Sequence, residues 1–374
     1  MCGLLEKPIW HDVGVERAQS HGRLQSSSCH TYATLASATL ASASSNMQPR
    51  SVYSKIAGTG SYLPDKIVTN ADLEKMVDTT SAWILERTGI ERRHIVAPEQ
   101  STLDMVEHAA RRALQAANAA AEEIDLIALG TTTPAQLFPN TACLLQKRLG
   151  IGGPPAIQVE AACTGFIYAM SIADKFIRLG EAKCALVIGA ECVSKLVDWT
   201  DRNTCVLFGD GAGAVVLKPS SEQGIISTHL HADGEYSDLL FYPTGASCHH
   251  NPTVPDDKQH AIIMKGTEVF KVAVNKLSSV VDETLAANDL DKSAIDWLVP
   301  HQANLRIIQA IAKKLDLPPE RVIVTVRDHG NTSAASVPLA LDTGVRDGRI
   351  KRGDLLLLEA FGGGLTWGSA LVRF

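Results

Sequence analysis

The chain has 374 residues, of which 45% are hydrophobic and 20% charged, so its length allows two globular domains or one domain with a large core. The formal net charge of −6 excludes a general attraction to nucleic acid, and no apolar run is long enough to span a bilayer. The eight cysteines show no CxxC spacing and mostly lie in apolar stretches, which is typical of reduced, buried thiols and predicts no metal site.

Residues 1–51 differ in composition from the rest of the chain. No acidic residue occurs between Glu16 and Asp65, and residues 26–46 are mostly Ser, Ala and Thr, which predicts a disordered extension. The segment is either translated from an upstream start, with Met47 or a nearby codon as the true one, or an organellar transit peptide. We favour the first, which predicts a cytoplasmic protein, while the second would predict a plastid one.

Beyond residue 51, short β-branched strands alternate with helices, which predicts an α/β fold. Residues 124–129 and 185–188 are expected to be strands. Residues 165–179 are expected to form a helix that ends at Gly180.

An internal repeat is the most informative feature of this pattern. Four segments of the first half recur in the same order in the second half, and each pair is predicted to share its structure: 124–129 with 295–300, 157–164 with 322–332, 182–188 with 350–358, and 208–217 with 361–372. In the second of these pairs, residues 322–326 are expected to be a strand. The repeat predicts two similar halves, residues 52–220 and 221–374, related by a pseudo-twofold axis.

Cys163 is the candidate nucleophile. It follows a predicted strand and precedes a helix that is apolar on most sides, so it is expected at the positive end of a buried helix dipole. That setting predicts a thiol pKa below the free value of about 8.5. The alternative is a structural cysteine at the start of a helix.

His301 and Asn331 are the candidate partners of Cys163. His301 lies at the end of a predicted strand, where ligands bind in α/β folds, although a loop histidine would fit as well. Asn331 is suited to cap a helix, and only the repeat, which places it opposite Cys163, favours a catalytic role.

Two glycine clusters are candidate binding loops. Residues 209–213 do not form a dinucleotide-binding loop, because a strand rather than a helix follows them. Residues 361–364, Phe-Gly-Gly-Gly, follow a buried strand and could supply amide donors for an oxyanion, although a glycine-rich turn is the simpler explanation.

Four motifs together resemble the β-ketoacyl-acyl carrier protein synthase III family of bacterial fatty acid synthesis. They are Ala-Ala-Cys-Thr-Gly-Phe at 161–166, Pro-His-Gln-Ala-Asn at 300–304, Gly-Asn-Thr-Ser-Ala-Ala-Ser at 330–336 and Phe-Gly-Gly-Gly-Leu-Thr-Trp-Gly at 361–368. The likeness runs from about Tyr53 to Phe374. It implies the thiolase-like fold, a duplicated five-layered αβαβα arrangement, and a homodimer.

The resemblance also implies a reaction and a set of site residues. The reaction joins acetyl-CoA, or another short acyl-CoA, to malonyl-acyl carrier protein, with CoA as a substrate and no cofactor. The implied catalytic triad is Cys163, His301 and Asn331, with the amides of Cys163 and Gly363 as the oxyanion hole. The implied substrate contacts are Trp83, Arg87, Arg202, Asn304 and Phe138, and the implied carrier-protein contacts are Lys271, Gln302, Arg306, Lys313 and Lys314. For each of the four basic residues among the carrier-protein contacts, a solvated surface position is an equally good explanation.

Other classes share part of this pattern. A thiolase would need a second catalytic cysteine near the C-terminus, whereas the last cysteine here is Cys248. Elongating ketoacyl synthases carry a second histidine where this chain has Asn331, and plant-type polyketide synthases differ in the glycine motif. A papain-like hydrolase has the same Cys, His, Asn order but another cysteine signature. A non-catalytic acyl-binding protein is the remaining alternative.

Overall fold

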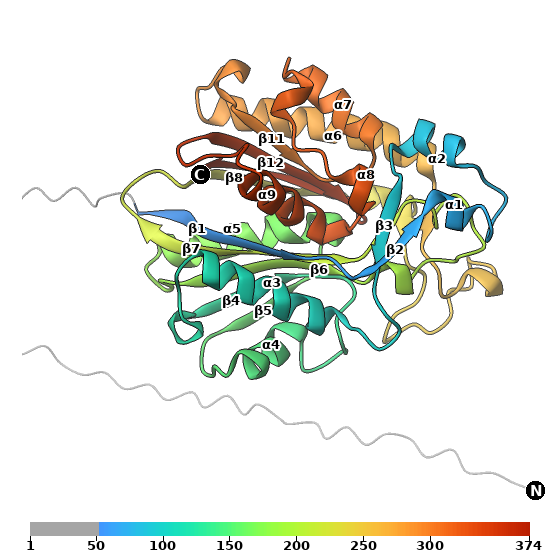
Figure 1. Ribbon diagram of the computed structural model, residues 1–374, viewed down its shortest axis with the longest axis horizontal. Coiled ribbons are helices and arrows are strands. Elements are labelled where there is room, and N and C mark those ends of the chain that lie inside the picture. The colour runs from blue at the N-terminus through green and yellow to red at the C-terminus, as the bar shows by residue number, and fades with distance from the viewer. Residues whose placement is uncertain (1–51) are drawn as a thin grey trace, which may run out of the picture. The chain divides into compact units, whose positions relative to one another are not determined.

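The computed structural model describes residues 52–374, so the predictions made for residues 1–51 lie outside the described part of the chain. Two sheets stand face to face in this part (Figure 1). The first has the strand order β1-β7-β6-β4-β5, with bounds β1 Tyr53–Tyr62, β4 Leu126–Gly130, β5 Ala156–Val159, β6 Ala185–Glu191 and β7 Gly211–Ser220. The second has the order β11-β12-β13-β8, with bounds β8 Ile225–Ala232, β11 Trp297–Pro300, β12 Leu355–Gly362 and β13 Thr366–Arg373.

Strand direction is similar in the two sheets. β4 pairs in parallel with β5 and β6, and β11 pairs in parallel with β12, while the remaining ladders are antiparallel. Successive residues of β4 enter different cores, because Leu126 contributes to the core between the sheets and Ile127 to the core on the outer side. A strand that is buried on both faces reads as a continuous apolar run, which is why these strands are visible in the sequence.

Helices form three layers around the two sheets (Figure 1). α5 (Gly165–Arg178) and α9 (Ser336–Arg346) lie between the sheets, where both of their sides are covered. The outer layers are α3 (Thr102–Ala116) with α4 (Thr141–Leu149), and α6 (Gly266–Ala287) with α7 (Leu305–Lys314). The order helix, sheet, helix, sheet, helix is the five-layered arrangement that was predicted.

Shorter elements surround the edges of the two sheets. They are β2 (Lys66–Thr69), α1 (Asn70–Leu73), α2 (Ser81–Thr88), β3 (Arg92–Ile95), β9 (Leu240–Phe241), β10 (Ile263–Met264) and α8 (Val326–His329). α2 ends at Gly89, whose φ of +74° suits glycine, and a Cβ there would lie 2.5 Å from the Cβ of Leu305. The close approach holds α2 against the first turn of α7.

Most of the predicted elements are confirmed. The strands expected at 124–129 and 185–188 are β4 and β6, and the helix expected at 165–179 is α5, with Gly180 just after it. The strand expected at 322–326 is wrong, since only Val322 forms a single bridge, to Leu298, and α8 begins at Val326. The Oε1 atom of Gln302 accepts the amides of Thr325 and Val326, which turns the chain into α8 too soon for a strand.

Two further observations bear on the organisation of the chain. β7 ends at residue 220 and β8 enters the second sheet at residue 225, although the division into halves at residue 220 remains a prediction.

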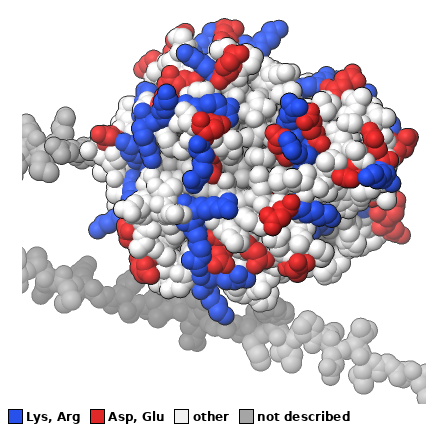
Figure 2. All heavy atoms as spheres, in the orientation of Figure 1, with Lys and Arg blue, Asp and Glu red and all other residues white. Residues whose placement is uncertain are grey.

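Among residues 52–374, no helix is both long and apolar enough to cross a membrane. Side chains of both signs lie interspersed on the face shown in Figure 2.

Candidate active site

Cys163 lies in a 3-10 turn, Ala162–Thr164, directly before α5. Ala162 has a φ of +45°, an uncommon conformation for a residue with a side chain, and the turn leaves Cys163 only 6% exposed. The end of β12 packs directly against it, because a Cβ on Gly362 would lie 2.6 Å from the Cys163 amide nitrogen. This glycine therefore brings the loop that contains Gly363 next to Cys163.

His301 follows β11 and is 5% exposed. Its Nδ1 atom lies 2.6 Å from the Oγ atom of Ser336, the first residue of α9. Burial lowers the pKa of His301 to about 3, so the imidazole is neutral at physiological pH. Because Nδ1 of the neutral ring is hydrogen-bonded to Ser336, the other ring nitrogen, Nε2, is the one available to bind a substrate.

Asn331 lies in the turn between α8 and α9 and is 8% exposed. Its backbone pairs with the segment before β7, since its amide donates to the Leu207 carbonyl and its carbonyl accepts from the Gly209 amide. Its side-chain Oδ1 atom accepts the Ser333 amide at 2.9 Å. Asn331 does not cap a helix, because the residue before the Ser333–Ala335 turn is Thr332 and α9 is preceded by Ala335. The bond from the Ser333 amide engages its Oδ1 atom and leaves Nδ2 as the donor.

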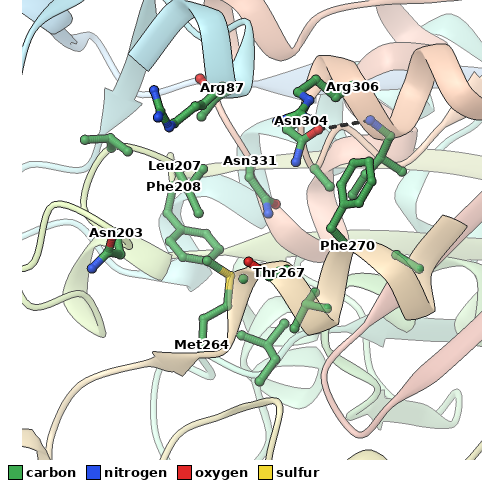
Figure 3. A pocket seen from close by; sticks show the side chains of 18 of the residues that line it. Arg87, Asn203, Leu207, Phe208, Met264, Thr267, Phe270, Asn304, Arg306 and Asn331 are labelled. Atoms are coloured by element: carbon green, nitrogen blue, oxygen red, sulfur yellow. Dashed lines mark hydrogen bonds between the residues drawn. The ribbon is translucent and has the colours of Figure 1, made fainter. Parts of the chain in front are cut away.

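A single cavity of about 640 Å³ contains all three residues in its lining. Cys163, His301 and Asn331 come from three separate turns, and Cys163 and Asn331 line one cavity as the repeat predicts. Figure 3 shows Asn331 below the rim residues Arg87 and Asn304, with Phe208 beneath it. Arg87 is exposed whereas Cys163, His301 and Asn331 are buried, so the cavity runs from an exposed rim to a buried floor that contains the triad.

The predicted sign of the Cys163 pKa shift is wrong. Burial, opposed by a hydrogen bond with Ser333 and reinforced by the nearby Glu191 carboxyl, raises the pKa of the thiol to about 12. Loss of water disfavours the thiolate, which is opposite to the effect of a helix N-terminus that the sequence suggested. The resting nucleophile is a neutral thiol and needs help to lose its proton.

Glu191 and Ser333 were not singled out by the sequence. Glu191 ends β6, is fully buried and lies close enough to Cys163 to influence its pKa. Burial raises the pKa of Glu191 to about 7, and hydrogen bonds from hydroxyls and one amide limit the rise. The only sequence signal was an acidic residue at the end of a strand that is otherwise apolar.

The outer rim contains four of the residues that the family resemblance implied as substrate contacts. The guanidinium carbon of Arg87 lies 4.6 Å from the Trp83 ring centroid, and that of Arg202 lies 5.2 Å from it. Trp83 and Arg87 line the cavity. Asn304 lines it too, and its Oδ1 atom caps α7 by accepting the Ile307 amide.

The residues predicted to contact the carrier protein do not all reach the surface. Lys271 and Arg306 line the cavity, and Lys313 and Lys314 end α7, where Lys314 pairs with Asp282 at 2.8 Å. Gln302 corrects the prediction. Its side chain is 1% exposed, because its amide binds the carbonyls of Pro300 and Ile323 as well as the start of α8. It therefore shapes the loop and has no free surface to offer a partner.

Phe138 lies outside the cavity lining. It is 79% exposed, and the adjacent Leu137 is 67% exposed. Two neighbouring large apolar side chains in water are unusual for a monomeric surface and are typical of an interface.

The fold and this cavity together define a thiolase-like condensing enzyme. A buried cysteine at the start of the helix between two sheets faces an imidazole and an amide from the other sheet's side of the fold. Residues 157–234 match the family model 3-Oxoacyl-[acyl-carrier-protein (ACP)] synthase III, and residues 285–374 match the model of that family's C-terminal part.

Known proteins identify the family. The beta-ketoacyl-[acyl-carrier-protein] synthase III of Thioalkalivibrio sulfidiphilus is 63% identical over 322 residues, 86% of this chain and 99% of the relative, and that of Xanthomonas euvesicatoria is 62% identical with the same coverage. The crystal structure of 3-oxoacyl-[acyl-carrier-protein] synthase III from Aquifex aeolicus has a TM-score of 0.80 at 49% identity and covers 86% of this chain and 100% of that chain. The chain therefore belongs to the β-ketoacyl-[acyl-carrier-protein] synthase III family and is an acyltransferase of fatty acid synthesis. The predicted family and thiolase-like fold are confirmed.

Proposed function

We propose that this protein joins acetyl-CoA, or another short acyl-CoA, to malonyl-acyl carrier protein through an acyl group carried on Cys163. The products are acetoacetyl-acyl carrier protein, CoA and carbon dioxide. The observation that carries the proposal is the shared cavity, in which a rim suited to a nucleotide leads to a buried thiol, imidazole and amide.

In the first half-reaction, the Cys163 sulfur attacks the acyl-CoA carbonyl and expels CoA. The amides of Cys163 and Gly363 stabilise the tetrahedral oxyanion. The support for this pairing is the close approach of β12, where only a glycine fits at position 362 beside the Cys163 backbone.

In the second half-reaction, the malonyl thioester loses carbon dioxide. This step creates the carbanion directly, so no strong base is needed to remove a proton, and a pair of hydrogen-bond donors suffices. Asn331 presents Nδ2, because its oxygen is held by Ser333. His301 presents Nε2–H when the Ser336 hydroxyl donates to Nδ1, and its low pKa keeps it a neutral donor.

The rim holds the CoA moiety. Trp83, Arg87 and Arg202 bind the adenine, since a flat aromatic ring and planar guanidiniums stack well on a heterocycle. The Arg87 and Arg202 contacts to Trp83 pre-assemble this group of side chains. Asn304 lines the passage between rim and floor and contacts the pantetheine arm.

The carrier protein docks beside the same rim. Its acidic surface is met by Lys271 and Arg306 at the cavity mouth and by Lys313 and Lys314 at the end of α7. Basic residues in the last turn of a helix also stabilise the helix through its dipole. The effect of Lys313 and Lys314 on carrier-protein affinity must therefore be measured separately from their effect on folding stability. Lys314 contributes least, because Asp282 neutralises it.

The protein acts as a homodimer. The support is the exposed pair Leu137 and Phe138, which a second copy would cover, placing Phe138 against the partner's acyl pocket. The dimer is tested by sedimentation of the wild-type chain and of Phe138→Ser, which should weaken association.

The central experiment is a mass spectrum of the protein after incubation with acetyl-CoA alone. An acetyl adduct on Cys163 is expected, and Cys163→Ser should show none. Turnover to free acetate would instead indicate a hydrolase, and the absence of any adduct on the wild type would indicate a binding protein. A panel of acyl-CoA primers with malonyl-acyl carrier protein then defines the primer.

A further inference from the structure

A buried carboxyl group lies beside the nucleophile and has no part in the chemistry described so far. Glu191 is 0% exposed and accepts hydrogen bonds from the Thr132 amide at 3.0 Å and from the hydroxyls of Thr132 at 3.1 Å and Thr133 at 2.6 Å. No ion pair among the described residues includes it. A charge buried this deeply is costly, which favours a functional explanation.

Ser333 connects this carboxyl group to the thiol. Its Oγ atom donates a hydrogen bond to the Oε1 atom of Glu191 at 3.4 Å, and its side chain lies close enough to Cys163 to lower the pKa of the thiol. Ser333 is 5% exposed and has a φ of +49°, a conformation that costs free energy for a residue other than glycine. The turn thus holds a hydroxyl in a strained position between a nucleophile and a carboxylate.

We infer that Ser333 and Glu191 form a proton relay that deprotonates Cys163 as it attacks the acyl thioester and reprotonates it when the condensation ends. Ser333 contacts the reacting sulfur, and Glu191 is a positioning residue that acts through Ser333. The inference rests on the proposed acylation of Cys163 and adds the step that a neutral thiol requires.

The relay conserves protons over the whole cycle. During attack, the S–H bond breaks, its proton passes to Ser333 Oγ, and the Ser333 proton passes to Glu191 Oε1, while the sulfur bonds to the acyl carbon. The expelled CoA thiolate takes one proton from solvent. Decarboxylation gives the carbanion, which attacks the acyl carbon and expels the Cys163 thiolate, and Glu191 returns its proton to that thiolate through Ser333. The net reaction therefore consumes one solvent proton, which ends on the thiol of the released CoA.

His301 is a poorer candidate for this task. Its Nδ1 atom is engaged by Ser336 at 2.6 Å, and burial lowers the pKa of the ring to about 3. The titratable groups around Glu191 are Cys163, across Ser333, and Cys192, the next residue in the chain. Burial raises the pKa of the Cys192 thiol to about 12, and its Sγ atom accepts a hydrogen bond from Thr102, so Cys192 stays neutral.

The pH dependence of acylation follows from the sign of the shift. Burial raises the pKa of Glu191 to about 7, so below that pH the carboxyl is protonated and cannot accept a proton. Acylation by the wild type should therefore rise with pH and level off above about 7. Without the carboxylate, the thiol must ionise first, and the rate should keep rising by about tenfold per pH unit.

The test measures the first half-reaction alone. Wild type, Glu191→Gln, Glu191→Asp and Ser333→Ala are mixed with acetyl-CoA and no carrier protein, quenched at short times, and analysed for acetyl-Cys163 by intact mass between pH 5.5 and 9. Glu191→Gln and Ser333→Ala should acylate about 100-fold more slowly at pH 7 and lose the plateau. Glu191→Asp should recover part of the rate and the plateau.

Cys192→Ala is the matched control, because it removes a buried neighbour of Glu191 that is outside the relay, and its profile should match that of the wild type. A plateau that survives in both Glu191→Gln and Ser333→Ala overturns the relay, as does an equal loss of rate at every pH. Ser333→Ala decides the matter if Glu191→Gln does not fold, since Ala162 shows that alanine tolerates a similar φ. If wild type forms no adduct at all, the proposed function fails and not the relay alone.

Discussion

Two turns meet at the floor of the cavity, one in each half of the predicted repeat, and they use the same backbone device for different chemistry. Each contains a residue with a positive φ that carries a side chain, Ala162 at +45° and Ser333 at +49°, and each leads into a helix between the two sheets. One turn presents a thiol and the other presents an amide. The nucleophile's turn offers its thiol few polar partners, whereas the Asn331 turn is held by several hydrogen bonds.

The difference between the turns follows from what each group must do. A thiol that attacks a carbonyl benefits from a dry site, where a nearby base can act on it in the absence of competing water. A donor that stabilises an enolate must be fixed before the charge develops. Asn331 is fixed because its amide donates to the Leu207 carbonyl and its oxygens accept the amides of Gly209 and Ser333. The duplicated fold therefore supplies one position for making a bond and one for stabilising a charge.

The largest expected effect separates these two tasks. His301→Ala and Asn331→Ala should each slow decarboxylation of malonyl-acyl carrier protein by about 10²–10³-fold, the usual loss for a removed oxyanion donor, while acylation of Cys163 falls much less. Single-turnover acylation and carbon dioxide release measure the two steps. Equal losses in both half-reactions would contradict the assignment of the two turns to separate tasks.

Two glycines allow the turns to approach the first sheet, and substituting them should affect the two tasks differently. A Cβ on Gly130 would lie 2.3 Å from the Gly165 carbonyl carbon, at the start of α5, and a Cβ on Gly189 would lie 2.2 Å from the Ala334 carbonyl oxygen. Gly130→Ala should displace the Cys163 turn and slow acylation, whereas Gly189→Ala should displace the Asn331 turn and slow decarboxylation.

These losses should be of the order of 10–100-fold, with about 1–3 kcal/mol of lost stability. Rapid-quench kinetics and urea unfolding measure the two effects. Gly152→Ala is the control, because a Cβ there meets no atom within 4 Å. If both substitutions slow the same half-reaction, the two turns are mechanically coupled and the comparison between them fails.

Much of this arrangement could be predicted from the sequence. Strands buried on both faces, such as β4 and β6, read as apolar runs, and the buried helix α5 was visible from its apolar sides. Because the repeat preserved the order of its segments, it also predicted that Cys163 and Asn331 face one cavity, and the structure places both there.

The failed predictions concern long-range contacts. The pKa of Cys163 depends on burial and on Glu191, which is 28 positions away in the chain, and no local pattern reports that contact. The family resemblance implied that Gln302 contacts the carrier protein, yet its side chain is buried and satisfies backbone groups of other segments. Residues 322–326 have the composition of a strand, but the Gln302 side chain binds the amides of Thr325 and Val326, where α8 begins.

The two sheets also differ in how they hold a buried carboxyl group. Glu191 in β6 is surrounded by hydroxyls, whereas neither carboxyl oxygen of Glu359 in β12 has a partner, and burial raises the pKa of Glu359 to about 8. Between the unfolded pKa of about 4.5 and the folded value of about 8, the folded state binds a proton that the unfolded state has lost. Stability attributable to this group therefore falls as pH rises through that window.

Glu359→Gln should remove this dependence, because the amide does not ionise. The variant should match the wild type near pH 5 and exceed it by roughly 3–4 kcal/mol near pH 8, as measured by urea unfolding at both pH values. Glu320→Gln, a substitution at an exposed position, should leave the stability nearly unchanged at both. If the free energy of unfolding changed by the same amount between pH 5 and 8 in the wild type and in Glu359→Gln, the Glu359 carboxyl would already be ionised in the folded state. The contrast with Glu191, whose carboxyl accepts hydrogen bonds from hydroxyls, would then not arise from hydrogen bonding.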